Sequence, residues 1–228
     1  MAKQLHVASL SESAFFTIVA AALEAYEISH TNNPAVPHVP VETYGNLWGY
    51  ETYARNGERI LHISMADVET SAERTQDYVQ PKDESFELKQ ALIARFKPEL
   101  EYLGDFHSHP YDFDNDKIKT ALEVERGEYF RFSPGDFKHV KSLKETRSYR
   151  VGLVTTVFRA AKHVPRNDGY VCVEKEHYSC IRFSYDDLVI WIKAHVFADK
   201  NAISDQKVVL LCPAVGFDAS LLGALNDA

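Results

Sequence analysis

The chain of 228 residues has few cysteines, no block of basic residues and no long apolar run. Its three cysteines, Cys172, Cys180 and Cys212, show no CxxC spacing. An odd and sparse set fits a reducing compartment better than a disulfide framework. Cys172 and Cys180 can face each other across a hairpin, but buried free thiols are the favoured interpretation.

The charge balance is acidic, with 33 Asp and Glu against 25 Lys and Arg, and a formal net charge of −8. Without a basic block, a nucleic-acid partner is disfavoured. A basic protein surface can be attracted to such a chain, but net charge identifies no partner. The apolar stretch at residues 14–23 is too short to span a bilayer, and it lacks the flanks of a signal peptide. We therefore expect a soluble, cytoplasmic protein.

Hydrophobic residues make up 45% of the chain, which is enough for a packed core. Periodicity, caps and turn signals predict helices and strands that alternate along the chain. Helices are expected at residues 12–28 (after a capping-box pattern at Ser9), 84–96, 118–126, 134–144 and 186–197. Strands are expected at residues 42–53, 58–65, 100–106, 149–158, 169–173, 178–183 and 208–212, with a connector at 31–40, a hairpin turn at 56–57 and a loop at 66–82. This order favours an α/β domain with one mixed β-sheet flanked by helices.

The most informative stretch is His107-Ser108-His109-Pro110, which directly follows the apolar run that ends the strand at residues 100–106. Residues two apart on a strand project to the same face, so this spacing aims two imidazoles at one point. Downstream, Ser133-Pro134-Gly135-Asp136 places a hydroxyl and a carboxylate at the start of a predicted helix. Upstream, Glu42 opens the strand at residues 42–53.

These residues are the parts of a hydrolytic zinc site. His107, His109 and Asp136 can supply three ligands, which leaves a fourth position open to water, as in catalytic zinc sites. Glu42 can act as general base and then as general acid. Ser133 can donate a hydrogen bond to a developing oxyanion.

The same residues carry a family resemblance. Glu42, His107-Ser108-His109-Pro110 and Ser133-x-x-Asp136 together resemble the JAMM motif of MPN+/JAB-domain zinc metalloproteases, over roughly residues 10 to 160. The resemblance implies a cytidine-deaminase-like fold, one zinc ion on His107, His109 and Asp136, and Glu42 and Ser133 as the catalytic residues. It also implies hydrolysis of amide or isopeptide bonds at the C-terminus of ubiquitin-like proteins or carriers.

One spacing departs from the family pattern. Here 23 residues separate His109 from Ser133, where the family usually has a far shorter spacer. We interpret this as an insertion at about residues 111–131, forming a flap beside the zinc, within a single domain over residues 1–228. The part after about residue 160 is interpreted as a C-terminal extension. Asp112, Asp114 and Asp116 lie closer to His109, but none has a serine three residues before it, so Asp136 is retained.

Each candidate also has an ordinary structural interpretation. Asp136 can be a first-turn carboxylate, Ser133 only an N-cap, and Glu42 a solvated strand residue. Ser108 should point away from the ligands and bond the scaffold. Asp105 shares their side of the strand, where it can be a partner of an imidazole or, as we favour, simply solvated.

Other patterns are weaker. Asp112, Asp114, Asp116 and Glu123 mimic a calcium loop, but Lys117 replaces its required glycine, so a solvated acidic loop is favoured. The remaining histidines with no ligand spacing include His62, His139, His163, His177 and His195, and both Trp48 and Trp191 are expected in the core. Deaminase chemistry is set aside because its Pro-Cys-x-x-Cys pattern is missing. The alternative to a hydrolase is a non-catalytic MPN scaffold module.

Overall fold

The computed structural model describes residues 5–30, 35, 37–76, 78–160, 171–173, 178–197 and 207–218. Within these residues the elements are β1 (Leu5–Leu10), α1 (Glu12–Glu27), β2 (Tyr44–Tyr53), β3 (Arg59–Val68), β4 (Glu73–Arg74), β5 (Val79–Gln80), α2 (Asp83–Phe96), β6 (Glu101–Tyr111), α3 (Phe113–Asp116), α4 (Ala121–Arg126), α5 (Pro134–Thr146), β7 (Val151–Arg159), β8 (Val171–Cys172), β9 (Cys180–Tyr185), β10 (Leu188–Val196), β11 (Lys207–Leu211) and the 3₁₀ turn η1 (Pro213–Val215). The fold is therefore a mixed α/β fold, as predicted. None of the helices in this part of the chain is long and apolar enough to cross a membrane.

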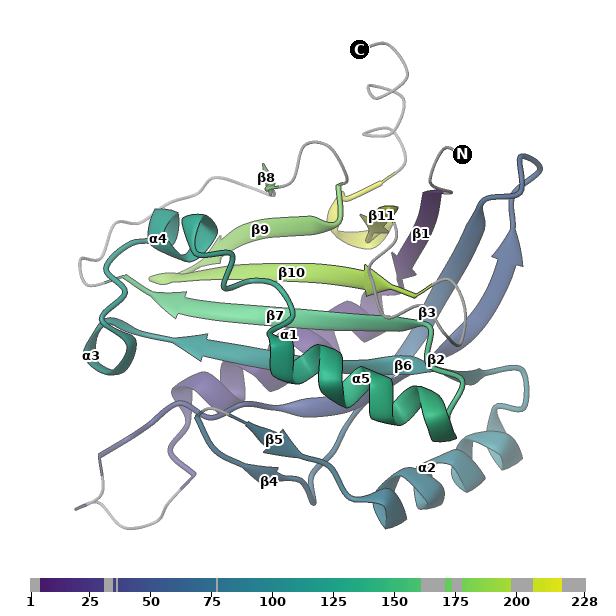
Figure 1. The fold of residues 1–228 in the computed structure, drawn as a ribbon, viewed down its shortest axis with the longest axis horizontal. Helices are drawn as coiled ribbons and strands as arrows, with labels where there is room; N and C mark the ends of the chain where they lie inside the picture. Colours follow the sequence, from purple (N-terminus) through teal and green to yellow (C-terminus); the bar gives the residue numbers. More distant parts are fainter. Residues whose placement is uncertain are drawn as a thin grey trace.

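Nine strands of the described chain form one curled mixed sheet, in the order β11-β1-β3-β2-β6-β7-β10-β9-β8 (Figure 1). The neighbours β1 and β11, β1 and β3, and β6 and β7 are parallel, and the other pairs are antiparallel. β6, which carries the two histidines, is thus an inner strand between β2 and β7. Strands β8 to β11, which follow residue 160, belong to this same sheet.

Helices cover both faces of the sheet. In Figure 1, α1 lies behind the sheet and α5 lies in front of it. On the α1 side, Phe15 and Ile18 pack against Leu103 and Phe106 of β6 in the largest core cluster. On the other side, α2 and α5 contribute apolar residues to a second cluster around Trp48. Phe106 therefore enters the α1 layer, and its neighbour His107, together with His109 two residues further on, lies on the opposite side, toward α5.

The segment between β6 and α5 has a small core of its own. Ile118, Val124 and Phe130 pack against Phe158 of β7 and Trp191 of β10. Because Phe158 and Trp191 are fully buried there, the predicted insertion is firmly packed on the α5 side of the sheet. It contains the short helices α3 and α4, where the sequence predicted one helix at residues 118–126.

A close approach of two backbones shapes the strand that leads to the histidines. Gly104 has φ 154° and pairs with Val151 of β7. A Cβ atom at this position would lie 1.7 Å from the Val151 carbonyl oxygen, so no larger residue fits without separating β6 from β7.

Most local predictions are confirmed. The helices near residues 12–28, 84–96 and 134–144 and the turn at Asn56-Gly57 are present, and Gly57 has φ 84°. Trp48 and Trp191 are buried, as expected of core residues. All three cysteines are free, with Cys180 and Cys212 buried and Cys172 half-buried. The connector predicted at residues 31–40 and the strand predicted at residues 169–173 lie partly outside the described residues.

Three predictions are wrong. Residues 186–197 are the end of a hairpin and strand β10, not a helix, because this strand is buried on both faces and its apolar run shows no alternation. Asp186, with φ 53°, makes the turn before it. Ser9 lies in the unpredicted strand β1, and the true N-cap of α1 is Ser11, whose side chain accepts from Ala14 N. The loop expected at 66–82 includes the end of β3 and the short strands β4 and β5.

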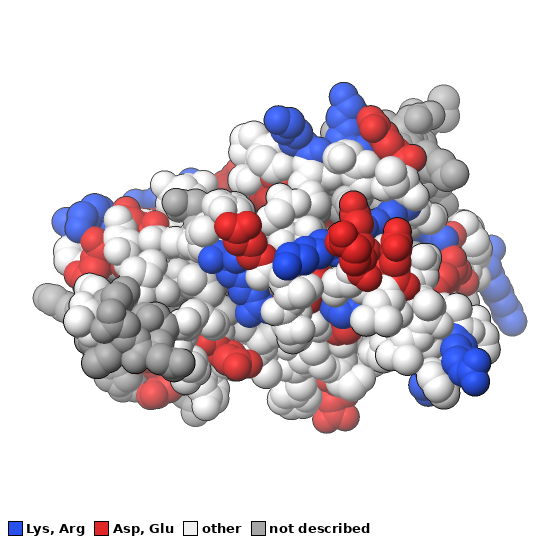
Figure 2. Space-filling model, turned by 90° about the horizontal axis from the view of Figure 1, so that it is seen from below, with Lys and Arg blue, Asp and Glu red and all other residues white. Residues whose placement is uncertain are grey.

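The face of the molecule seen in Figure 2 is mixed in charge. Figure 2, which shows the molecule from below, has acidic and basic side chains interspersed. Neither sign covers this face.

Candidate metal centre

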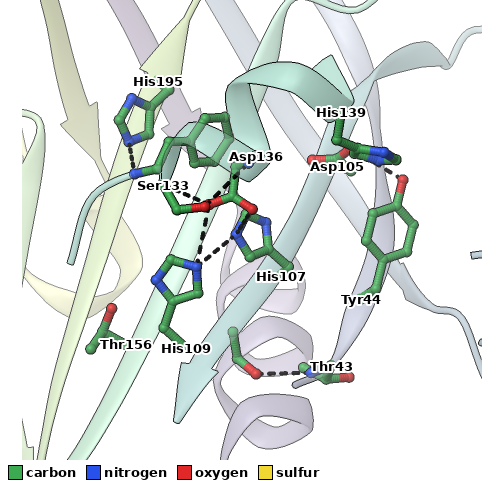
Figure 3. Close-up of polar contacts among 12 residues, drawn as sticks. Thr43, Tyr44, Asp105, His107, His109, Ser133, Asp136, His139, Thr156 and His195 are labelled. Carbon is green, nitrogen blue, oxygen red and sulfur yellow. Dashed lines mark hydrogen bonds and ion pairs between the residues drawn. The ribbon is translucent and has the colours of Figure 1, made fainter. Parts of the chain in front are cut away.

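Three side chains from two elements converge on the α5 side of the sheet. His107 and His109 extend from β6, and Asp136 lies in the first turn of α5 (Figure 3). The two Nε2 atoms are 3.1 Å apart, and each lies 3.4 Å from an oxygen of Asp136. Among the described residues this is the group of His, Cys, Asp and Glu side chains that can hold a metal ion. Both histidines are 6% exposed, and Asp136 is half-buried.

Asp136 serves two purposes. Ser133 Oγ accepts a hydrogen bond from Asp136 N at 3.2 Å, and Asp136 Oδ2 accepts one from Ser133 N at 2.6 Å. This capping box begins α5 and also fixes the carboxylate in front of the two histidines (Figure 3). The N-cap and ligand interpretations of Ser133-x-x-Asp136 are therefore compatible in one geometry.

The charges of His107 and Asp136 depend on each other. Burial lowers the pKa of His107, but the Asp136 carboxylate, followed by Glu42 and Asp105, more than offsets this and raises it to about 9. Burial raises the pKa of Asp136, but the adjacent His107 and His109 outweigh burial and hold it well below its usual range. In the metal-free site, a proton on His107 thus compensates the carboxylate.

The other ring nitrogen of His109 is also fixed. Its Nδ1 lies 3.2 Å from the carbonyl oxygen of Tyr129, in the segment between β6 and α5. A carbonyl can only accept, so Nδ1 donates to Tyr129, and Nε2 is the nitrogen that faces Asp136 and His107. This is the arrangement that orients histidine ligands in metal sites.

Glu42 lies next to the site but outside the metal-binding group. It precedes β2, is 9% exposed, and its backbone N donates to Thr75 O. Burial has the largest effect on the pKa of His107 and of Tyr111, and the Glu42 charge adds an upward shift to both. The carboxylate is therefore buried within electrostatic reach of the histidines, which contradicts the solvated interpretation.

Ser108 connects the two parts of the site, as its predicted scaffold role requires. Its Oγ accepts from Thr43 N at 2.9 Å, and its N donates to Thr43 O at 3.0 Å. The residue between the two histidines thus holds the residue that follows Glu42.

Asp105 was expected to be solvated, and this is wrong. It is 1% exposed and accepts hydrogen bonds from Tyr149 at 2.8 Å and from Tyr44 at 3.1 Å, with His139 Nε2 3.8 Å away. Burial raises its pKa, and the charges of His139 and His107 offset this only in part. The three partners come from β2, α5 and the segment between α5 and β7, so spacing within the sequence gives no sign of them.

His195 is a neighbour of the site that sequence reasoning missed. Its Nε2 accepts from Phe132 N at 3.2 Å, and its ring stacks on that of Phe132 with centroids 4.1 Å apart. Its place on β10, read as a helix from sequence, hid this proximity. His163 and His177 lie outside the described residues.

The acidic run after His109 does not form a second cluster of the metal-binding kind. Asp112 caps α3 by accepting from Asn115 N at 2.6 Å, and Asp116 accepts from Asp112 N at 2.8 Å. These carboxylates serve the local helix, not a calcium loop.

Comparison with known proteins finds no match for this chain, either among protein-family models or among curated proteins. The interpretation of the site therefore depends on its own geometry.

Proposed function

We propose that this protein is a zinc-dependent metallopeptidase or isopeptidase of the JAMM type with a JAB/MPN fold. The observation that carries the proposal is the convergence of His107, His109 and Asp136 in a buried site beside Glu42. The mixed sheet between α1 and the pair α2 and α5 is compatible with that fold.

The ligand atoms suit zinc. Tetrahedral ligands about 2.0–2.1 Å from zinc lie about 3.3 Å from one another. The separations here are 3.1 Å between the two Nε2 atoms and 3.4 Å from each Nε2 to a carboxylate oxygen. Two imidazoles and one carboxylate are also a donor set that leaves one position open in catalytic zinc sites. When bound, zinc would polarise the scissile carbonyl and lower the pKa of a water molecule to about 7.

The chain's own residues would handle protons and the oxyanion. Glu42 would take a proton from the attacking water and hand it to the leaving amine. The Ser133 Oγ acts as acceptor in the capping bond, which leaves its O–H as a donor to the developing oxyanion. The Tyr129 carbonyl would keep His109 in the tautomer that presents Nε2.

Metal analysis of the purified protein tests the site. We expect near-stoichiometric zinc in wild type and in Glu42→Gln, and its loss in His107→Ala with Asp136→Ala. A protein that binds no zinc even after reconstitution would contradict the proposal and favour the scaffold alternative.

Cleavage tests the activity. The resemblance suggests substrates with an amide or isopeptide bond at the C-terminus of a ubiquitin-like protein, so a panel of such fusions and linkages is the first screen. Cleavage by wild type that persists undiminished in Glu42→Gln would remove Glu42 from its proposed role.

A further inference from the structure

A cavity of about 450 Å³ adjoins the metal centre. It shares His109 and Ser133 with that centre, so anything bound in it lies beside the reacting atoms. Its volume falls within the range of small-molecule binding sites, roughly 300–1,000 Å³. The other walls come from the segment between β6 and α5, from the start of α5 and from β10.

Four aromatic side chains, those of Tyr111, Tyr129, Phe132 and Phe137, line this cavity. Tyr111 and Tyr129 pack with centroids 5.3 Å apart, and Phe137 meets the edge of Phe132 at 5.5 Å. The Phe132 ring in turn stacks on His195, whose Nε2 accepts from the Phe132 backbone. These mutual contacts hold the rings in place before any ligand binds. Pre-formed ring faces favour a large apolar group over a small or charged one.

The charged residues at the cavity do not favour a charged ligand. Glu128 and Arg131 lie 3.4 Å apart and form an ion pair, with side chains that are 57% and 41% exposed. Since they compensate each other, neither offers a strong net field to a ligand of one sign.

Tyr129 links the cavity to the metal ligand. Helix α4 ends in a Schellman turn, in which Tyr129 N donates to Val124 O and Glu128 N donates to Glu125 O. Glu128 adopts φ 55° at the position where glycine is usual. The turn directs the Tyr129 carbonyl to His109 Nδ1 and leaves the Tyr129 side chain at the cavity.

We propose that this cavity binds a bulky apolar or aromatic side chain of the substrate, beside the bond that is hydrolysed. The proposal rests on the hydrolase function above and narrows its substrates. A chain end made only of small residues such as glycine would leave the cavity unfilled. The 23 residues that separate His109 from Ser133 thus supply walls of the proposed pocket and also the Tyr129 carbonyl that contacts the metal ligand His109.

Peptide binding tests the pocket without any need for hydrolysis. The probes are five blocked peptides, acetyl-Ala-Ala-Xaa-Ala-Ala-amide, with Gly, Leu, Phe, Lys or Glu at Xaa. They are titrated into full-length Glu42→Gln protein and followed by amide NMR shifts. Burial of a large apolar side chain predicts dissociation constants for the Phe and Leu peptides about tenfold or more below that of the Gly peptide. The perturbed amides should centre on residues 127–137.

Two variants of Tyr129 and one control variant sharpen this test. Tyr129→Ala removes a wall but keeps the backbone carbonyl that contacts His109, and should reduce the Phe-over-Gly preference several-fold. Tyr129→Phe keeps the ring and should retain the preference. Leu122→Ala, on α4 but outside the cavity, is the matched control because Leu122 is 52% exposed and should change nothing.

The outcomes separate the two proposals. Equal affinity for the Phe and Gly peptides, or shifts centred elsewhere, overturns the pocket even if wild type cleaves amide bonds. Absence of zinc or of any cleavage overturns the hydrolase even if the Phe peptide binds as expected. For a peptide that wild type cleaves, mass spectrometry should place the cut at a bond next to Xaa. A cut remote from Xaa contradicts the pocket's place beside the scissile bond.

Discussion

Two buried hydroxyls on neighbouring strands should respond in opposite ways to removal. Ser108 of β6 pairs with Thr155 of β7, and their side chains belong to residues that are 2% and 0% exposed. Ser108 Oγ accepts from the buried Thr43 N at 2.9 Å. Thr155 Oγ1 has no hydrogen-bond partner within the described residues. Comparing the two variants separates the contribution of the Ser108 hydrogen bond to stability from the effect of removing a buried hydroxyl.

The expected magnitude follows from the group that is left behind. Ser108→Ala leaves the Thr43 N–H buried without its acceptor, which costs about 1–3 kcal/mol. For a protein of this size that lowers the melting temperature by about 2–12 °C. Thr155→Val removes a hydroxyl that is already unpaired, so its effect should be neutral or slightly stabilising.

Chemical denaturation and thermal melting of both variants measure the difference. Zinc content should stay at the wild-type level in Ser108→Ala, because this side chain points away from the metal ligands. Cleavage activity should fall, because Thr43 follows the proposed proton carrier Glu42. Equal stability of Ser108→Ala and wild type, together with destabilisation by Thr155→Val, would refute the reasoning.

Three further predictions follow from the same region. Zinc at about 100 times its dissociation constant should stabilise the metal-free protein by about 2.7 kcal/mol in a thermal-shift assay, and no shift would contradict a specific site. Because Asp136 outweighs burial and raises the pKa of His107 to about 9, zinc must displace a proton below that pH. Zinc affinity measured against a chelator should therefore rise about tenfold per pH unit from pH 6 to 8 and level off above about 9. A flat profile would show that zinc binding displaces no proton from His107. Gly104→Ala should lower the free energy of unfolding by well over 3 kcal/mol or prevent folding, since its Cβ would lie 1.7 Å from Val151 O. Gly57→Ala has open space around it and should cost only about 1 kcal/mol. Similar melting temperatures of the two variants would contradict this reasoning.

The local features of the metal centre could be predicted from sequence because each depends on short-range geometry. The i, i+2 spacing of His107 and His109 places both on one side of a strand. Ser133-Pro134 marks the start of a helix, and its capping box orients Asp136. That these two elements meet was predicted only through the family resemblance, since spacing alone does not bring residue 136 to residue 107.

Two of the failures, at β10 and at Asp105, share one physical cause, which is that tertiary burial overrides local pattern. β10 lies between β7 and β9 and is buried on both faces, so its sequence lacks the alternation that marks a half-exposed strand. Asp105 was read as solvated because nothing near it in the sequence indicates the hydroxyls of Tyr44 and Tyr149.

The sequence by itself determined that His107 and His109 share one side of a strand, the capping box at Ser133 and the α/β class, because backbone periodicity and hydrogen bonding within a few residues decide them. Only the tertiary structure decided what surrounds the donors. It brings the Tyr129 carbonyl to His109, buries Glu42 beside the histidines, and closes a ring-lined cavity between α5, β10 and the segment after His109. These contacts join residues far apart in the chain, and the packing of the whole sheet selects them.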